Sequence, residues 1–157
     1  MKSNAVSGQD RFGTDQFAGF QSRDIGSPQL PGSASRAETG WDVTAGGVDI
    51  WEKSDQFHFV SKQLTSDFDI AVRVERFTPA HLYSKAGLMI RDTLKADSPH
   101  LMFLVFSDNS PRNNNLGGYE MQFRSTAGGD CRAIYPAVKP PAPPEFPVAY
   151  PNSWLRV

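Results

Sequence analysis

The chain has 157 residues, 39% of them hydrophobic and 21% charged, which fits a folded domain with a sizeable core rather than a disordered chain. The formal net charge of −1 excludes a globally basic protein built to bind nucleic acid. The longest apolar run, Leu101–Phe106, is far shorter than the ~20 residues of a membrane span. We therefore expect neither a nucleic acid nor a membrane as partner.

The chain's N-terminal residues and its single cysteine leave its compartment open. Residues 1–11 are polar and are predicted to form a flexible lead-in to one domain over residues 12–157. They lack the apolar segment of a secretory signal peptide. Cys131 is the only cysteine, so no internal disulfide can form. The localisation is therefore left unknown.

Alternating apolar residues predict β-strands in the first half of the chain. In Phe68–Glu75 every second residue is apolar, a two-residue period typical of a half-buried strand. The flanking segments Phe57–Leu64 and Lys85–Arg91 alternate in the same way. We expect these three segments to be consecutive antiparallel strands, and we expect a further strand at Trp41–Ala45.

The second half of the chain continues this pattern. Leu101–Phe106 is apolar on both faces, which predicts a central strand that is covered on both sides. Tyr119–Arg124 alternates again, and shorter strands are expected at Arg132–Tyr135 and Trp154–Val157. Between these last two, residues 136–151 contain seven prolines, which predicts an extended polyproline-like loop outside any sheet interior.

These short strands, separated by Gly-rich and Pro-rich turns, predict an all-β fold with almost no helix. The expected architecture is an antiparallel sandwich of two sheets. A closed barrel is the alternative.

Four segments carry a family resemblance: Gly46–Trp51, Ser54–Phe57, Phe68–Val74 and Lys85–Arg91. They resemble the regulation-of-enolase-protein-like family, whose mostly uncharacterised domains look like concanavalin A-like lectin/glucanase jelly rolls. The resemblance implies a jelly-roll sandwich. It also implies further strands after the final Trp-Leu-Arg segment, so we expect the jelly roll to be incomplete at its C-terminal end.

The arrangement of carboxylates argues against a glycoside hydrolase. Retaining glucanases of this fold place carboxylates on one strand as Glu-X-Asp-X-X-Glu, which sets nucleophile and acid about 5–5.5 Å apart. This chain contains no Glu-X-Asp, and its glutamates lie in separate segments. Its serines and its cysteine also lack the surroundings of a nucleophile elbow. We therefore expect no catalytic residues and no enzymatic activity, with a glycoside hydrolase as the least favoured reading.

No metal or cofactor is expected. Asp67 and Asp69 have a spacing that could join a calcium site, but a turn residue followed by an outward strand residue is the simpler interpretation. His58, His81 and His100 lie in different segments without the spacing of metal ligands.

The most promising group of side chains is a polar face on two strands. Alternation places Lys85 and Arg91 on one side of their strand, and it places Glu120, Gln122 and Arg124 on one side of theirs. If the two sides face one concavity, these groups could hydrogen-bond sugar hydroxyls while two aromatic rings stack on the sugar, namely those of Trp51 and Tyr83. An ordinary solvated face with cross-strand ion pairs is the alternative.

The sequence thus predicts a non-catalytic binding module for a glycan or polysaccharide. The alternative function is a structural or regulatory domain that contacts a protein partner.

Overall fold

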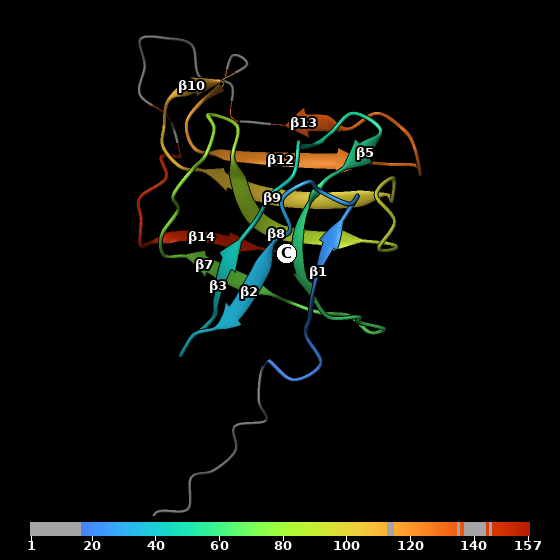
Figure 1. Cartoon of the computed structure of the whole chain (residues 1–157). Helices are drawn as coiled ribbons and strands as arrows, with labels where there is room; N and C mark the ends of the chain where they lie inside the picture. The colour runs from blue at the N-terminus through green and yellow to red at the C-terminus, as the bar shows by residue number, and fades with distance from the viewer. Residues whose placement is uncertain (1–16, 113–114, 135, 137–143, 145) are drawn as a thin grey trace, which may run out of the picture.

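The computed structural model describes residues 17–112, 115–134, 136, 144 and 146–157, and these residues form strands and turns without a helix (Figure 1). Within them, no helix is long and apolar enough to cross a membrane. The predicted lead-in at residues 1–11 and half of the proline-rich loop, residues 137–143 and 145, lie outside the described residues. The strands are β1 Gln21–Ile25, β2 Ser33–Arg36, β3 Trp41–Thr44, β4 Ile50–Trp51, β5 Ser54–Asp55, β6 Phe57–Ser61, β7 Ala71–Val74, β8 Lys85–Arg91, β9 His100–Phe106, β10 Pro111–Arg112, β11 Asn115–Leu116, β12 Tyr119–Arg124, β13 Arg132–Ile134 and β14 Ser153–Arg156.

The largest sheet has four antiparallel strands in the order β13-β12-β9-β8. β8 and β12 occupy the segments in which alternation predicted strands. β9 lies between them, as expected for a run that is apolar on both faces. We call these four strands the central sheet.

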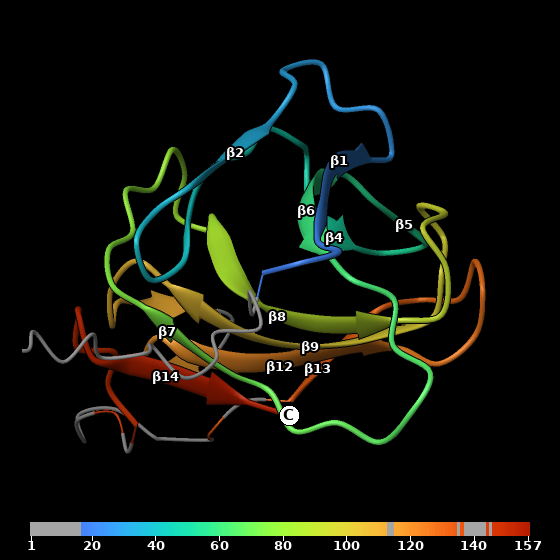
Figure 2. The ribbon, with the colours of Figure 1, turned by 90° about the horizontal axis from the view of Figure 1, so that it is seen from below.

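A separate apolar core lies against each face of the central sheet. On one face, Met89, Met102, Leu104 and Phe106 pack against Ile50, and the half-buried rings of β6 lie beside them. On the other face, the core is formed by strands β7 and β14, by strands of the central sheet and by the segment before β14; its buried members are Val105, Val148 and Leu155. Figure 2 shows β1, β2, β4, β5 and β6 on one side of the central sheet.

The predicted pairing of three consecutive strands is wrong. β6 pairs with β1, β7 pairs with β14, and β8 pairs with β9. The reason lies in the two cores: Phe57 and Phe59 of β6 pack on one face of the central sheet, whereas Val72 and Val74 of β7 pack on the other. Strands that bury their side chains on opposite faces of a third sheet cannot be neighbours in one sheet.

The fold is therefore all-β and antiparallel, as the sequence predicts. Beside the four-stranded central sheet, the described residues form five sheets of two strands each. The central sheet holds the polar side chains that the sequence singled out, and the strands that cover it decide which of them solvent can reach.

Candidate functional site

The register of the central sheet brings the five predicted polar side chains to one face. In β8, Lys85 lies opposite Phe106 and Arg91 lies opposite His100. In β12, Glu120 lies opposite Leu104 and Arg124 lies opposite His100. Residues two apart on a strand share a face, so the remaining predicted side chain, that of Gln122, joins this face as well. The face also carries the first apolar core, and strands β4–β6 cover it.

Asp55 of β5 occupies the covered part of this face. Its carboxylate binds the Arg124 guanidinium with two oxygens, at 2.7 Å from Nη2 and 2.9 Å from Nη1. Arg91 Nη1 lies 3.4 Å away and His100 Nδ1 lies 3.6 Å away. The side chains of Asp55 and Arg124 are fully buried, and 2% of the Arg91 side chain is exposed. A buried charge is tolerated only with partners of this quality.

Backbone carbonyls satisfy the rest of the Arg124 guanidinium. It donates to the carbonyl oxygens of Trp51 and Glu52 at 3.2 Å, of Ser98 at 3.1 Å and, through Nε, of Gly129 at 3.0 Å. Arg124 therefore fastens the β4–β5 hairpin and two loops onto the central sheet. Arg91 and Arg124, predicted to contact a ligand, are enclosed and serve the packing of the fold.

Cys131 and His100 border this cluster. The Cys131 sulfur lies 3.8 Å from His100 Nε2. Burial raises the pKa of the Cys131 thiol to about 11 and lowers the pKa of His100 from its usual 6.5. The thiol is therefore neutral at physiological pH, which removes its nucleophilicity. In the part of the chain that the structure describes, no three His, Cys, Asp or Glu side chains are placed to hold a metal ion.

The other end of the same face carries a second polar network, which we call the Lys85 network. Lys85 Nζ donates to Asp49 Oδ1 at 2.7 Å and to Gln122 Oε1 at 3.3 Å, and Gln122 Nε2 donates to Glu120 Oε1 at 2.7 Å. Only 8% of the Lys85 side chain is exposed, but 39% of the Asp49 side chain is. Burial raises the pKa of Glu120 above its usual value. Asp49 is thus the part of this network that solvent reaches most easily.

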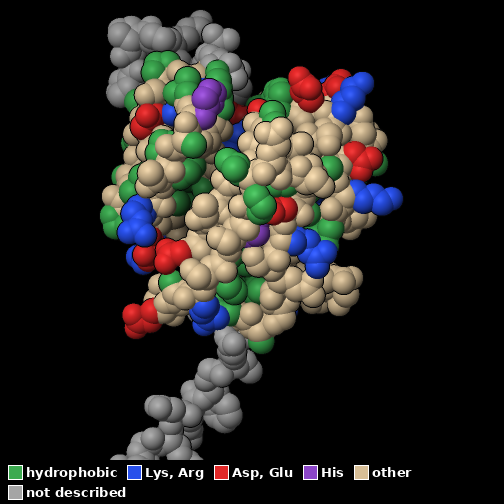
Figure 3. Space-filling view, in the orientation of Figure 1, with side chains coloured by type: hydrophobic (Ala, Val, Ile, Leu, Met, Phe, Trp, Pro, Cys, Tyr) green, Lys and Arg blue, Asp and Glu red, His purple; other side chains and the backbone are tan. Residues whose placement is uncertain are grey.

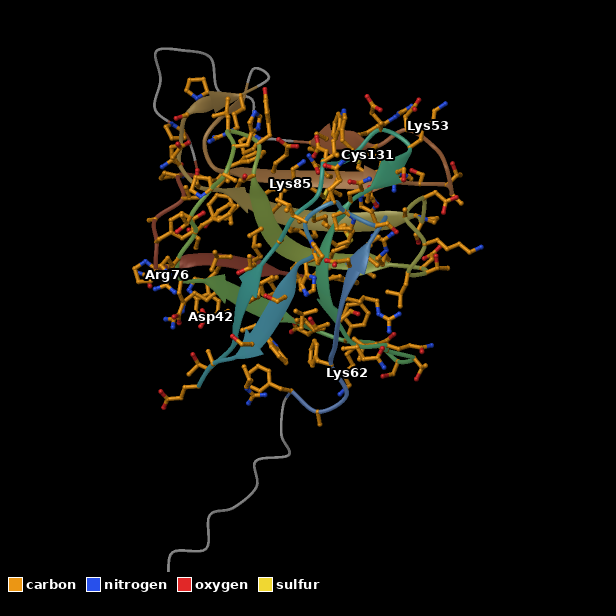
Figure 4. The ribbon with its side chains drawn as sticks, in the orientation of Figure 1. Asp42, Lys53, Lys62, Arg76, Lys85 and Cys131 are labelled. Atoms are coloured by element: carbon orange, nitrogen blue, oxygen red, sulfur yellow. The ribbon has the colours of Figure 1, made fainter. Side chains whose placement is uncertain are left out.

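The two predicted stacking aromatics stand near these networks without forming an open platform. Trp51 is half-buried in β4, and its carbonyl oxygen accepts a hydrogen bond from Arg124. Tyr83 is half-buried in the loop before β8, packs against the first core, and has its ring centroid 5.9 Å from that of His81. Figure 4 labels Lys85 over the central sheet and Cys131 at the far end of the same region.

A third arrangement was missed by the sequence reasoning. Ser22 and Asp24 of β1 and His58 of β6 form a hydrogen-bonded row on the outer face of the β1–β6 sheet. Ser22 and Asp24 have the two-residue spacing of one strand face. Their histidine partner is 34 residues further along the chain from Asp24. The spacing was visible in the sequence, but only the strand pairing reveals the histidine.

The histidines and the aspartate that the sequence analysis considered as metal ligands, and set aside, lie apart from one another. His58 bonds Asp24, His81 lies in the exposed loop before β8, and His100 lies beside Asp55. Asp69 pairs with Arg156 of β14, which occupies both carboxylate oxygens. Asp69 is exposed, which agrees with its simpler interpretation as an outward-facing residue.

An apolar groove of ≈ 530 Å³ lies on the opposite side of the central sheet from the Lys85 network. Its lining includes Phe103 and Tyr119 of the central sheet, Phe146, and Trp154 and Leu155 of β14. Trp154 is 58% exposed and Phe146 is 56% exposed. Figure 3 shows how hydrophobic side chains and charged side chains intermingle over the face seen in Figure 1.

Comparison with known proteins gives no relative for this chain: no family model, no curated protein and no solved structure matches it.

Proposed function

We propose that this protein is a binding module for a glycan or polysaccharide, and that the ligand binds at the Lys85 network. The observation that carries the proposal is the position of Asp49. Its carboxylate is partly exposed. A chain of hydrogen bonds leads from it through Lys85 and Gln122 to the enclosed Glu120. We further propose that the two cores around the central sheet belong to a variant of the concanavalin A-like sandwich, in keeping with the resemblance of the sequence.

Such a network suits sugar hydroxyls because it fixes donors and acceptors before the ligand arrives. Carboxylate oxygens accept from hydroxyl groups, and the hydrogen bonds within the network hold the Asp49 side chain in place. A hydroxyl exchanges water for protein at a small net gain, so we expect a dissociation constant in the range of about micromolar to millimolar. Trp51 and Tyr83 stand beside the network as half-buried rings.

The proposed module performs no glycoside hydrolysis. Glu120 is only 9% exposed, and its Oε1 already accepts a hydrogen bond from Gln122. Asp49 Oδ1 is held by Lys85 and by the backbone N–H of Ile50. A pair of carboxylates that flanks a glycosidic bond has to reach that bond from both sides, and the enclosed Glu120 does not.

Replacing Asp49 by Asn tests the proposal with little change of shape. We expect Asp49→Asn to weaken binding to the best ligand of a glycan array by about tenfold or more, since a hydrogen bond to a charged group contributes about 1.5–3 kcal/mol. The matched control is Asp42→Asn at an exposed β3 carboxylate, which should bind like the wild type. Equal affinities for the wild type and Asp49→Asn, measured by titration calorimetry, would refute the site.

A protein-interaction domain is the second candidate, and the exposed aromatic groove along β14 favours it. This alternative places the binding surface at Trp154 rather than at Asp49. Trp154→Ala in the same binding measurements separates the two. If this variant loses a partner while Asp49→Asn keeps it, the protein-interaction function replaces the glycan-binding one.

A further inference from the structure

The Ser22–His58–Asp24 row has the atom order of a nucleophile, its base and the group that orients the base. Ser22 Oγ lies 2.8 Å from His58 Nε2. On the other side of the ring, His58 Nδ1 lies 2.7 Å from Asp24 Oδ1. These are hydrogen-bonding distances, and each ring nitrogen has the partner that activation of a serine requires.

We propose that Ser22, His58 and Asp24 form a second site of this protein that transfers the acyl group of a carboxylic ester to Ser22 and then to water. The proposal departs from the sequence-based expectation of a protein without enzymatic activity. It is independent of the glycan site, since none of its residues belongs to the Lys85 network. A negative result at one site therefore leaves the other untouched.

Strand pairing builds the row. Asp24 lies directly opposite His58 in the β1–β6 ladder, and Ser22 lies two residues away on the same face of β1. The neighbouring residues of β6, Phe57 and Phe59, point the other way into the first core. The row therefore lies on one face of a two-stranded sheet, and the aromatic rings on the opposite face pack against the first core.

The loop between β1 and β2 fixes the histidine and the aspartate. The backbone N–H of Gly32 donates to both oxygens of Asp24, at 3.0 Å and 3.2 Å. A Cβ at Gly32 would lie 2.4 Å from ring atoms of His58, so only glycine lets the loop cross so close to the imidazole. The hydrogen bond from His58, with a smaller contribution from Gly32, holds the pKa of Asp24 below its usual value. Asp24 thus stays ionised, as the orienting group must.

The solvent exposure of the three side chains matches their proposed roles. The His58 side chain is 3% exposed, the Asp24 side chain is 25% exposed, and Ser22 is exposed. The base is shielded from water while the nucleophile is open to a substrate. Figure 2 shows β1 apart from the strands of the central sheet, which carries the Lys85 network.

The reaction follows from this geometry. Ser22 Oγ attacks the ester carbonyl carbon while His58 Nε2 takes the hydroxyl proton, and Asp24 stabilises the resulting imidazolium. The C–O bond to the alcohol then breaks, and His58 returns the proton to the departing alcohol. Water attacks the acyl-Ser22 ester in the same way, with its proton passing through His58 to Ser22 Oγ. The products are one carboxylic acid and one alcohol, and Ser22 and His58 return to their starting states.

A fluorophosphonate probe and p-nitrophenyl acetate test the proposal on the full chain. We expect mass spectrometry to find the phosphonyl adduct on Ser22, and we expect ester hydrolysis to be lost in Ser22→Ala. Ser35→Ala on β2, which also replaces an exposed serine, is the matched control and should be labelled like the wild type. Circular dichroism of each variant establishes that it is folded.

The histidine variants separate a relay from a purely structural hydrogen bond. His58→Ala should react with the probe about a hundredfold or more slowly, the usual contribution of a general base, and added imidazole should restore part of the rate. His58→Gln provides the same comparison if the alanine variant does not fold. Absence of an adduct on Ser22 in the folded wild type would overturn the proposal, and so would equal labelling of wild type and His58→Gln.

Discussion

Asp55 is the residue on which the covered face of the central sheet depends. It neutralises Arg124 and lies within 3.6 Å of His100 and 3.4 Å of Arg91, all without solvent contact of its own side chain. Replacing Asp55 by Asn removes the charge and leaves two guanidinium groups enclosed. Breaking a buried pair in this way costs about 3–5 kcal/mol. We expect urea unfolding of Asp55→Asn to show a loss of that size.

The control for Asp55→Asn is the solvent-exposed ion pair of Asp69 and Arg156. Asp69 binds Arg156 through both oxygens, as a bidentate pair, but 62% of the Asp69 side chain is exposed. Solvent screens such pairs, so Asp69→Asn should change the free energy of unfolding far less than Asp55→Asn. Comparable losses in the two variants would contradict the role we give to burial.

The sequence could predict which side chains of the candidate site share a side of their strand, but not which of them are buried. Alternation placed Lys85 and Arg91 on one side of β8 and Glu120, Gln122 and Arg124 on one side of β12, because that information lies within each strand. Only the pairing of both strands with β9 makes these two sides one face. Alternation could not show that the side chains of Arg91 and Arg124 are buried beside a carboxylate from another segment, that of Asp55. Asp55 lies 69 residues before Arg124 in the chain, on the short strand β5, which no alternation pattern predicted.

At the scale of elements, β8 and β9 approach so closely that Gly87 has no room for a side chain. A Cβ there would lie 2.2 Å from the Phe103 carbonyl oxygen and 2.9 Å from the Leu104 Cα. Both are backbone atoms, so they can move only if the pairing of the two strands is distorted. We expect Gly87→Ala to destabilise the fold by about 1–3 kcal/mol, the usual cost of overpacking, measured by chemical denaturation.

Gly40, in the turn between β2 and β3, is the matched position for this test. A Cβ there meets no atom within 4 Å. Gly40→Ala should therefore change the free energy of unfolding by less than about 1 kcal/mol. If Gly87→Ala proves as stable as Gly40→Ala, the two strands are not packed as tightly as described.

The positions of the strands with a clear alternating or apolar pattern could be predicted, but β1, β2 and the partners of most strands could not. Lys85–Arg91 and Tyr119–Arg124 fold as the strands that alternation indicates, since each pattern records which side is buried. The pairings β1–β6 and β7–β14 join segments far apart in the chain, and no local signal specifies them. For the same reason the Ser22–His58–Asp24 row was invisible to sequence reasoning.

At the scale of the whole molecule, the central sheet has an apolar core on each face, and ionisable side chains lie between the sheet and the strands that cover one of these faces. Lys85, Glu120, Arg124 and His100 all lie on the face that β4–β6 cover. Burial shifts the pKa values of Glu120 and His100 in opposite senses, upward for Glu120 and downward for His100. Both shifts favour the neutral form of the group, so the stability of the fold is coupled to pH through this layer.

His100 makes this coupling measurable. Its pKa in the folded state is lowered from 6.5, chiefly by burial, although Asp55 opposes the shift. Between the folded value and 6.5, the unfolded chain binds a proton that the folded chain does not, so stability rises with pH and is lost as pH falls through this window. One such group changes the free energy of unfolding by at most about 1.4 kcal/mol per pH unit. Below that window both states are protonated, and the contribution no longer changes.

The prediction is that His100→Gln flattens the pH dependence of unfolding just below pH 6.5, the usual pKa of this group. Glutamine keeps polar atoms near Asp55 and Arg124 but does not titrate. The carboxylates whose pKa values are lowered, Asp24, Asp69 and Asp108, remain in the variant and still weaken the fold at lower pH. Urea midpoints measured in steps from about pH 7.5 to about pH 5 supply the comparison. Parallel curves for the wild type and His100→Gln would show that His100 takes up its proton equally in both states, contrary to its enclosure beside Arg124.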